Sequence, residues 1–90
     1  MPIVRFAWSP LLVDVRREQC PRAKWDRAHR AWTMTQAEAD RFLEASHSRL
    51  NFVRESTEVL IDDARWIVGF VQGAPWVMPR QDGAPGPEVI

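Results

Sequence analysis

The fold of this protein is decided by residues 35–50, whose sequence is TQAEADRFLEASHSRL. Thr35 and Glu38 have the spacing of a capping box, in which the threonine hydroxyl accepts a hydrogen bond from the Glu38 amide and the Glu38 carboxylate accepts one from the Thr35 amide. Apolar and small side chains then recur at helical spacing on one face. That face holds Ala39, Phe42, Leu43, Ser46 and Leu50. The stretch therefore predicts one main helix over about residues 36–50, with Asn51 as its stop.

The segments that follow this helix predict a β-hairpin. Residues 57–61, TEVLI, are rich in β-branched side chains, and residues 66–71, WIVGFV, strongly favour a strand. Between them, residues 62–65, DDAR, are a turn candidate. Because both faces of the second segment are apolar, we expect it to be a central strand with Trp66 in the core.

The segments that precede the helix predict further short strands. Residues 3–8 are largely apolar, and residues 11–16, LLVDVR, alternate with the period of a half-buried strand. Pro10 lacks an N–H group, so we expect the strand ladder to break there. Residues 23–25 and 31–34 predict two strands around a polar turn that Asp26 starts.

Together these elements predict an α+β fold in the order β-β-β-β-α-β-β. We expect a small antiparallel or mixed sheet of about four to six short strands packed against the one main helix. A single domain is expected over residues 1–78. Residues 79–90 are rich in proline and glycine, which predicts a disordered tail.

Composition narrows the class of protein. The chain has 90 residues, which suits one domain, and its 12 basic side chains balance its 12 acidic ones. Cys20 is its only cysteine, so no internal disulfide can form. The first residues do not resemble a signal peptide, and no apolar run is long enough to span a membrane. We therefore expect a cytoplasmic protein.

Charge is unevenly distributed along the chain, which suggests a nucleic-acid partner. Residues 1–34 hold seven basic and three acidic side chains, a net charge of +4, and Trp25 and Trp32 lie among the basic ones. Cations attract phosphate and exposed aromatic rings stack on bases. The candidate nucleic-acid-binding residues are Arg16, Arg17, Arg22, Lys24, Trp25, Arg27 and Arg30. The alternative is that Trp25 and Trp32 cover the sheet while the arginines are simply solvated.

Catalytic and metal-binding motifs are missing from the sequence. The phosphate-binding patterns G-x-x-x-x-G-K-[ST] and G-x-G-x-x-G do not occur. The metal-binding patterns C-x-x-C and H-E-x-x-H do not occur either. His29 and His47 are far apart, and His47 is expected to be a solvent-exposed helix residue. Arginines near Cys20 could lower its thiol pKa, but an inert, partly buried cysteine is the favoured interpretation. We therefore predict no catalytic residues, metal or cofactor, and no small-molecule substrate.

Residues 20–34, CPRAKWDRAHRAWTM, resemble the HARP-like module that lies beside some DNA-remodelling and annealing helicases. In that module a proline-containing approach leads to an aromatic–Asp pair, a basic turn, a Trp and a helix. Pro21, Trp25-Asp26, Arg30, Trp32 and the helix from Thr35 follow that order here. The resemblance covers roughly residues 11–50. It implies a free-standing module that associates with nucleic acid, in which Trp32 is structural; the chain has no Walker motif and no room for a motor.

The sequence thus predicts a small non-enzymatic binding module whose partner is nucleic acid. The alternative is a protein-interaction module, either a homodimer or a small inhibitor or adaptor of another protein. Its support is the tryptophan-rich composition, since Trp and Arg are enriched at interface hot spots.

Overall fold

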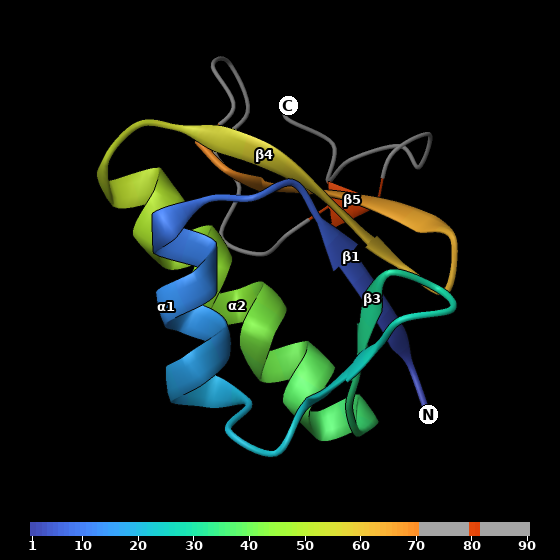
Figure 1. The fold of residues 1–90 in the computed structure, drawn as a ribbon. Helices are drawn as coiled ribbons and strands as arrows, with labels where there is room; N and C mark the ends of the chain where they lie inside the picture. Colours follow the sequence, from blue (N-terminus) through green and yellow to red (C-terminus); the bar gives the residue numbers. More distant parts are fainter. Residues whose placement is uncertain (71–79, 82–90) are drawn as a thin grey trace.

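A computed structural model describes residues 1–70 and 80–81. Within them it confirms the α+β class, with six strands in one sheet and two helices (Figure 1). The strands are β1 (Ile3–Phe6), β2 (Lys24–Asp26), β3 (Ala31–Thr33), β4 (Ser56–Ile61), β5 (Ala64–Gly69) and β6 (Arg80–Gln81). The helices are α1 (Pro10–Gln19) and α2 (Gln36–Phe52).

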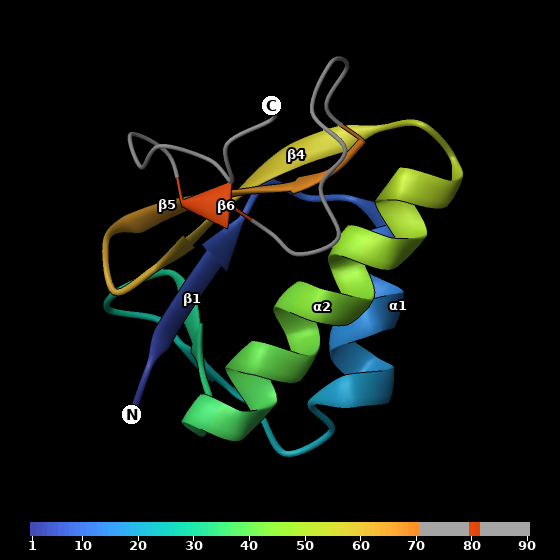
Figure 2. The same cartoon turned by 180° about the vertical axis from the view of Figure 1, so that it is seen from behind.

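The sheet has the strand order β2-β3-β1-β4-β5-β6, and every neighbouring pair is antiparallel. The first strand of the chain therefore lies inside the sheet, where Val4 is opposite Trp32 of β3 and Ile61 of β4. Both helices lie on the same side of the sheet, with α1 packed on α2 and α2 packed on β4 and β5 (Figures 1 and 2). The fold is a two-layer sandwich of helices on one sheet.

The core lies between α2 and the helix-facing side of the sheet. Phe42 of α2 is fully buried and stacks on Phe6 of β1, with 5.2 Å between ring centroids. Trp66 is partly buried and packs against the same cluster, which agrees with its predicted place. The fully buried side chains include Val4, Leu12, Val15, Met34, Phe42, Val59 and Val68.

Residues 11–16, predicted as a strand, belong instead to helix α1, so the order begins β-α-β-β and a second helix joins the main one. The reason is local. The Ser9 hydroxyl accepts a hydrogen bond from the Leu12 amide, and Pro10 occupies the first helical turn, where its missing N–H costs nothing. Leu12 and Val15, three residues apart, are both buried on one face. This spacing fits a helix, whereas in a strand the two side chains would point to opposite faces.

Helix α2 confirms the central prediction from the sequence. The Glu38 amide donates to the Thr35 hydroxyl at 3.1 Å, and the Thr35 amide donates to the Glu38 carboxylate at 3.0 Å, which is a complete capping box. The helix continues to Phe52, two residues past its predicted end. His47, expected at the surface, is buried at 4% exposure because it lies on the face that meets β5.

Both predicted hairpins form around aspartates. The β4–β5 turn consists of Asp62 and Asp63, whose φ angles of 49° and 68° are those of a two-residue type I′ turn. In the β2–β3 turn, one Asp26 carboxylate oxygen accepts hydrogen bonds from the amides of Ala28 and His29. The predicted boundary between domain and tail lies outside the described residues, although Arg80–Gln81 of the predicted tail pairs with β5.

Candidate nucleic-acid interface

Aromatic and arginine side chains from five segments line a groove of about 420 Å³, which we name the tryptophan–arginine groove. It lies between helix α1, the edge strand β2 and the neighbouring strand β3. Its lining residues are Phe6, Trp8, Val13, Arg16, Arg17, Trp25 and Trp32. The groove therefore combines ring faces with positive charge, as a surface for stacked, anionic ligands requires.

Trp32 is the fixed floor of this groove. The Arg16 guanidinium carbon lies 4.0 Å from the centroid of its ring, a cation–π contact. The Trp25 ring meets Trp32 edge to face, with centroids 5.3 Å apart and an interplanar angle of 67°. Arg16 also donates to the Cys20 carbonyl at 3.4 Å, which holds its side chain over the ring. The Trp32 ring is thus held in contact with both Arg16 and Trp25.

Trp8, Trp25 and Arg17 are the accessible members of the groove. The Trp8 side chain is 79% exposed in the loop before α1, and Trp25 is 52% exposed on the edge strand β2. Arg17 is exposed and makes no ion pair with any residue in the described part of the chain. Two ring surfaces and one unpaired guanidinium can therefore contact a bound molecule.

The structure separates the predicted binding residues into groups. Arg16, Arg17 and Trp25 meet in the groove. Lys24 lies next to Trp25 in β2, and the alternation of a strand places its side chain on the opposite face of the sheet.

The other three predicted cations lie away from the groove. Arg22 is close enough to Glu38 for its charge to lower that carboxyl's pKa, although the hydrogen bond from the Thr35 amide contributes more. Arg27 and Arg30 lie in the β2–β3 turn. The six cations of residues 16–30 thus do not form one patch.

Phe6, Trp8 and Val13 also line the groove, although the sequence did not predict them as binding residues. Val13, Arg16 and Arg17 have i, i+3, i+4 spacing, so they share one face only if residues 10–19 are helical. Recognising Ser9-Pro10 as a helix start would have exposed this face, and Trp8 immediately before it.

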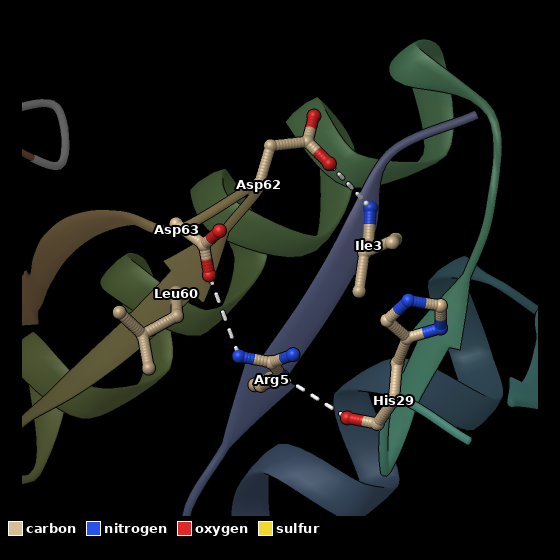
Figure 3. A pocket seen from close by; sticks show the side chains of 6 residues that line it. All are labelled: Ile3, Arg5, His29, Leu60, Asp62 and Asp63. Atoms are coloured by element: carbon tan, nitrogen blue, oxygen red, sulfur yellow. Dashed lines mark hydrogen bonds and ion pairs between the residues drawn. The ribbon is translucent and has the colours of Figure 1, made fainter. Parts of the chain in front are cut away.

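A second, smaller pocket of about 230 Å³ lies on the other side of the sheet (Figure 3). Arg5 donates to the His29 carbonyl at 3.1 Å and to the Asp63 carboxylate at 3.4 Å. The amide of Ile3 donates to the Asp62 carboxylate at 2.9 Å. Each charged side chain named here bonds to another part of the protein, so the pocket is a junction between the two hairpin turns.

His29 also bonds to Asp26, at 2.7 Å between Nδ1 and the carboxylate. This hydrogen bond is the main reason that the pKa of Asp26 lies below its ordinary value. The adjoining pocket has no serine, threonine, cysteine or lysine among its lining residues. The Asp26–His29 pair stabilises the β2–β3 turn. The Asp26 carboxylate also accepts hydrogen bonds from two amides of that turn.

Cys20 lies in an environment that disfavours its thiolate form. Cys20 is fully buried, its thiol contacts the Glu38 carbonyl at 3.3 Å, and burial raises its pKa despite the nearby arginines. The interpretation as an inert cysteine fits this environment. Within residues 1–70 and 80–81, no three His, Cys, Asp or Glu side chains are grouped to hold a metal ion.

Comparisons with protein-family models, with curated proteins and with solved structures found no match to this chain.

Proposed function

We propose that this protein is a non-enzymatic module that binds single-stranded nucleic acid at the tryptophan–arginine groove. The observation that carries the proposal is the exposure of Trp8 and Trp25 around a groove that also holds Arg16 and Arg17. Unpaired bases stack on such rings, and guanidinium groups attract the adjoining phosphate.

The arginines also separate this function from the main alternative for an aromatic groove. Clusters of tryptophan rings bind quaternary ammonium groups through the negative faces of the rings. Here the Arg16 guanidinium already occupies one face of Trp32, and the unpaired Arg17 adds a second positive charge. A cationic ligand would be repelled, whereas an anionic ligand with a flat ring suits both features.

The HARP-like resemblance supports the same proposal, because Trp25 and Trp32 of that motif are both groove residues. The unpaired, buried thiol of Cys20 is consistent with a reducing compartment, and a cytoplasmic location is part of the proposal. In the part of the chain that the structure describes, no helix is both long and apolar enough to cross a membrane.

The test is an anisotropy titration of a labelled single strand of about 12 nucleotides, a length that covers a typical single-strand site. Trp25→Ala should weaken binding by about 1–3 kcal/mol because it removes a stacking surface. Arg17→Ala should weaken binding and reduce its salt dependence, because one phosphate contact is lost.

Matched controls distinguish the groove from general charge. Arg27→Ala removes another exposed cation, outside the groove, and Phe52→Ala removes an exposed aromatic ring elsewhere. Both should bind like the parent. A folded parent protein that shows no binding at low salt would overturn the proposal. If Arg17→Ala and Arg27→Ala lost equal amounts of binding affinity, the binding site would not be the groove.

A protein-interaction function is the second candidate, and one specific observation favours it. At the end of helix α2, Phe52 is 89% exposed and Val53 48% exposed, beside a hollow of about 340 Å³ that Leu11 of α1 also lines. Exposed apolar surface of this kind is typical of protein contacts. Sedimentation equilibrium of the parent and of Phe52→Ser over a range of concentrations tests it: self-association that the substitution abolishes would support a homodimer, and a monomer throughout would contradict one.

A further inference from the structure

The number of unpaired cationic side chains at the groove limits the length of single strand that it can bind. Proteins that bind extended single strands combine stacking residues with a positively charged channel that follows the backbone. In this protein, the strand alternation of β2 turns Lys24 to the opposite sheet face, while Arg27 and Arg30 lie in a turn that does not line the groove. Lys24, Arg27 and Arg30 therefore do not extend the positive charge of the groove.

Inside the groove, only one guanidinium is available for a phosphate. Arg16 is held over the Trp32 ring at 4.0 Å and donates to the Cys20 carbonyl, so moving it would cost both contacts. Arg17 has no ion pair with a described residue and lines the same groove. One phosphate can be bound without dismantling the floor of the groove.

The volume of the groove also suits a ligand with a single phosphate. A volume of about 420 Å³ lies toward the lower end of the range of pockets that hold small organic molecules, roughly 300–1,000 Å³. Trp8 and Trp25 are the exposed rings, and both border this single hollow. The space suits one base rather than a row of stacked bases.

We propose that the tryptophan–arginine groove takes a single unstacked nucleobase together with one phosphate, the base against Trp8 and Trp25 and the phosphate on Arg17. This inference rests on the proposed nucleic-acid function and specifies its ligand. The same chemistry is present in a free nucleoside monophosphate and in one unpaired nucleotide of a strand. Duplex DNA should bind this groove more weakly, because its bases are stacked and must first leave the stack.

The experiment compares adenosine, adenosine monophosphate and single strands of deoxyadenosine of increasing length. Binding is followed by the indole N–H resonances of the folded protein in two-dimensional NMR, which separate the tryptophans from one another. The Trp8 and Trp25 resonances should shift and that of Trp66 should not. The monophosphate should bind more tightly than adenosine, and Arg17→Ala should remove that difference while Arg27→Ala keeps it.

Strand length and salt then distinguish this inference from the broader function. Affinity per nucleotide should stay constant as the strand lengthens, and it should fall only about threefold between 50 and 200 mM salt, as one phosphate contact predicts. If long strands bind, the monophosphate does not, and the loss with salt is a hundredfold or more, then the single-nucleotide inference is wrong and the strand-binding function stands. If no nucleic acid or nucleotide binds, both are wrong. If the monophosphate binds but longer strands do not, the ligand is a free nucleotide, which upholds the inference and overturns the strand-binding function.

Discussion

Gly69, at the end of β5, occupies a position where no side chain fits. Its φ angle is 103°, a region that residues with a Cβ rarely adopt. A Cβ added there would lie 2.2 Å from the Glu55 carbonyl oxygen and 2.7 Å from the Leu50 side chain. The close approach lets the last turn of α2 lie directly against the sheet.

Replacing Gly69 with alanine should therefore destabilise the protein by more than about 1 kcal/mol, because both the backbone angle and the space are incompatible with a methyl group. The measurement is the urea midpoint of unfolding. Ala28→Gly, a change at an exposed turn residue, should stay within about 0.5 kcal/mol of the parent. A Gly69→Ala protein as stable as the parent would show that the end of β5 is free to move.

The Gly69 amide also explains why a histidine is buried in α2. It donates to Nδ1 of His47 at 2.9 Å, so the imidazole is the acceptor for a backbone group that water cannot reach. His47→Ala should cost about 1–3 kcal/mol, since it leaves that amide without a partner. His47→Asn places an amide oxygen near the position of Nδ1 and should recover part of the loss. Equal urea midpoints for the two variants would contradict this role.

Among the elements, α2 was predictable from sequence because its capping box and its apolar face both indicate a helix that starts at the same place. The β4–β5 hairpin was predictable for a similar reason, since β-favouring segments flank a pair of aspartates. Helix α1 was not, because the alternation of Leu11, Val13 and Val15 matches a strand while Leu12 and Val15 match a helix. In such a short element the Ser9 cap and packing against α2 decide between them.

The candidate site was predicted only where it depends on local sequence. Trp25 and the basic character of residues 16–17 could be recognised directly. That Trp8 and Phe6 lie beside Trp25 could not be predicted. It depends on residues 10–19 being helical and on the pairing of β1 with β3. Likewise, charge counted along the chain gave one cluster of six cations, whereas strand alternation and the turn divide that cluster in space.

The capping box of α2 makes the stability of this element dependent on pH. The hydrogen bond from the Thr35 amide is the main reason that the pKa of Glu38 is lower than usual. A carboxyl group whose pKa is lower in the folded state stabilises the fold at neutral pH, and this contribution is lost as pH falls below the unfolded value of about 4.3. Thermal melts from pH 7 to pH 3 should show a smaller acid-induced loss in Glu38→Gln than in the parent. Glu44→Gln, at an exposed site on the same helix, is the control and should follow the parent curve.

For the whole molecule, stability depends on one shared core between α2 and the sheet. Phe42 is fully buried and stacks on Phe6, so Phe42→Ala should cost about 3–5 kcal/mol. For a domain of this size that is a large part of the total stability. Chemical unfolding measures the loss, with Phe52→Ala as the exposed control. If both phenylalanine variants unfolded at the parent's midpoint, the core would lie elsewhere.

The position of β1 has a consequence for how the chain reaches this state. During synthesis β1 emerges before one of its neighbours, β4, which ends at Ile61. Until then, one edge of the four-residue strand β1 has open hydrogen-bonding groups that could pair with another chain. The groove, in contrast, draws all of its residues from positions 6–32. All groove residues are therefore synthesised before β4 can pair with β1. The interval until β4 is synthesised is the period in which β1 is most exposed to mispairing.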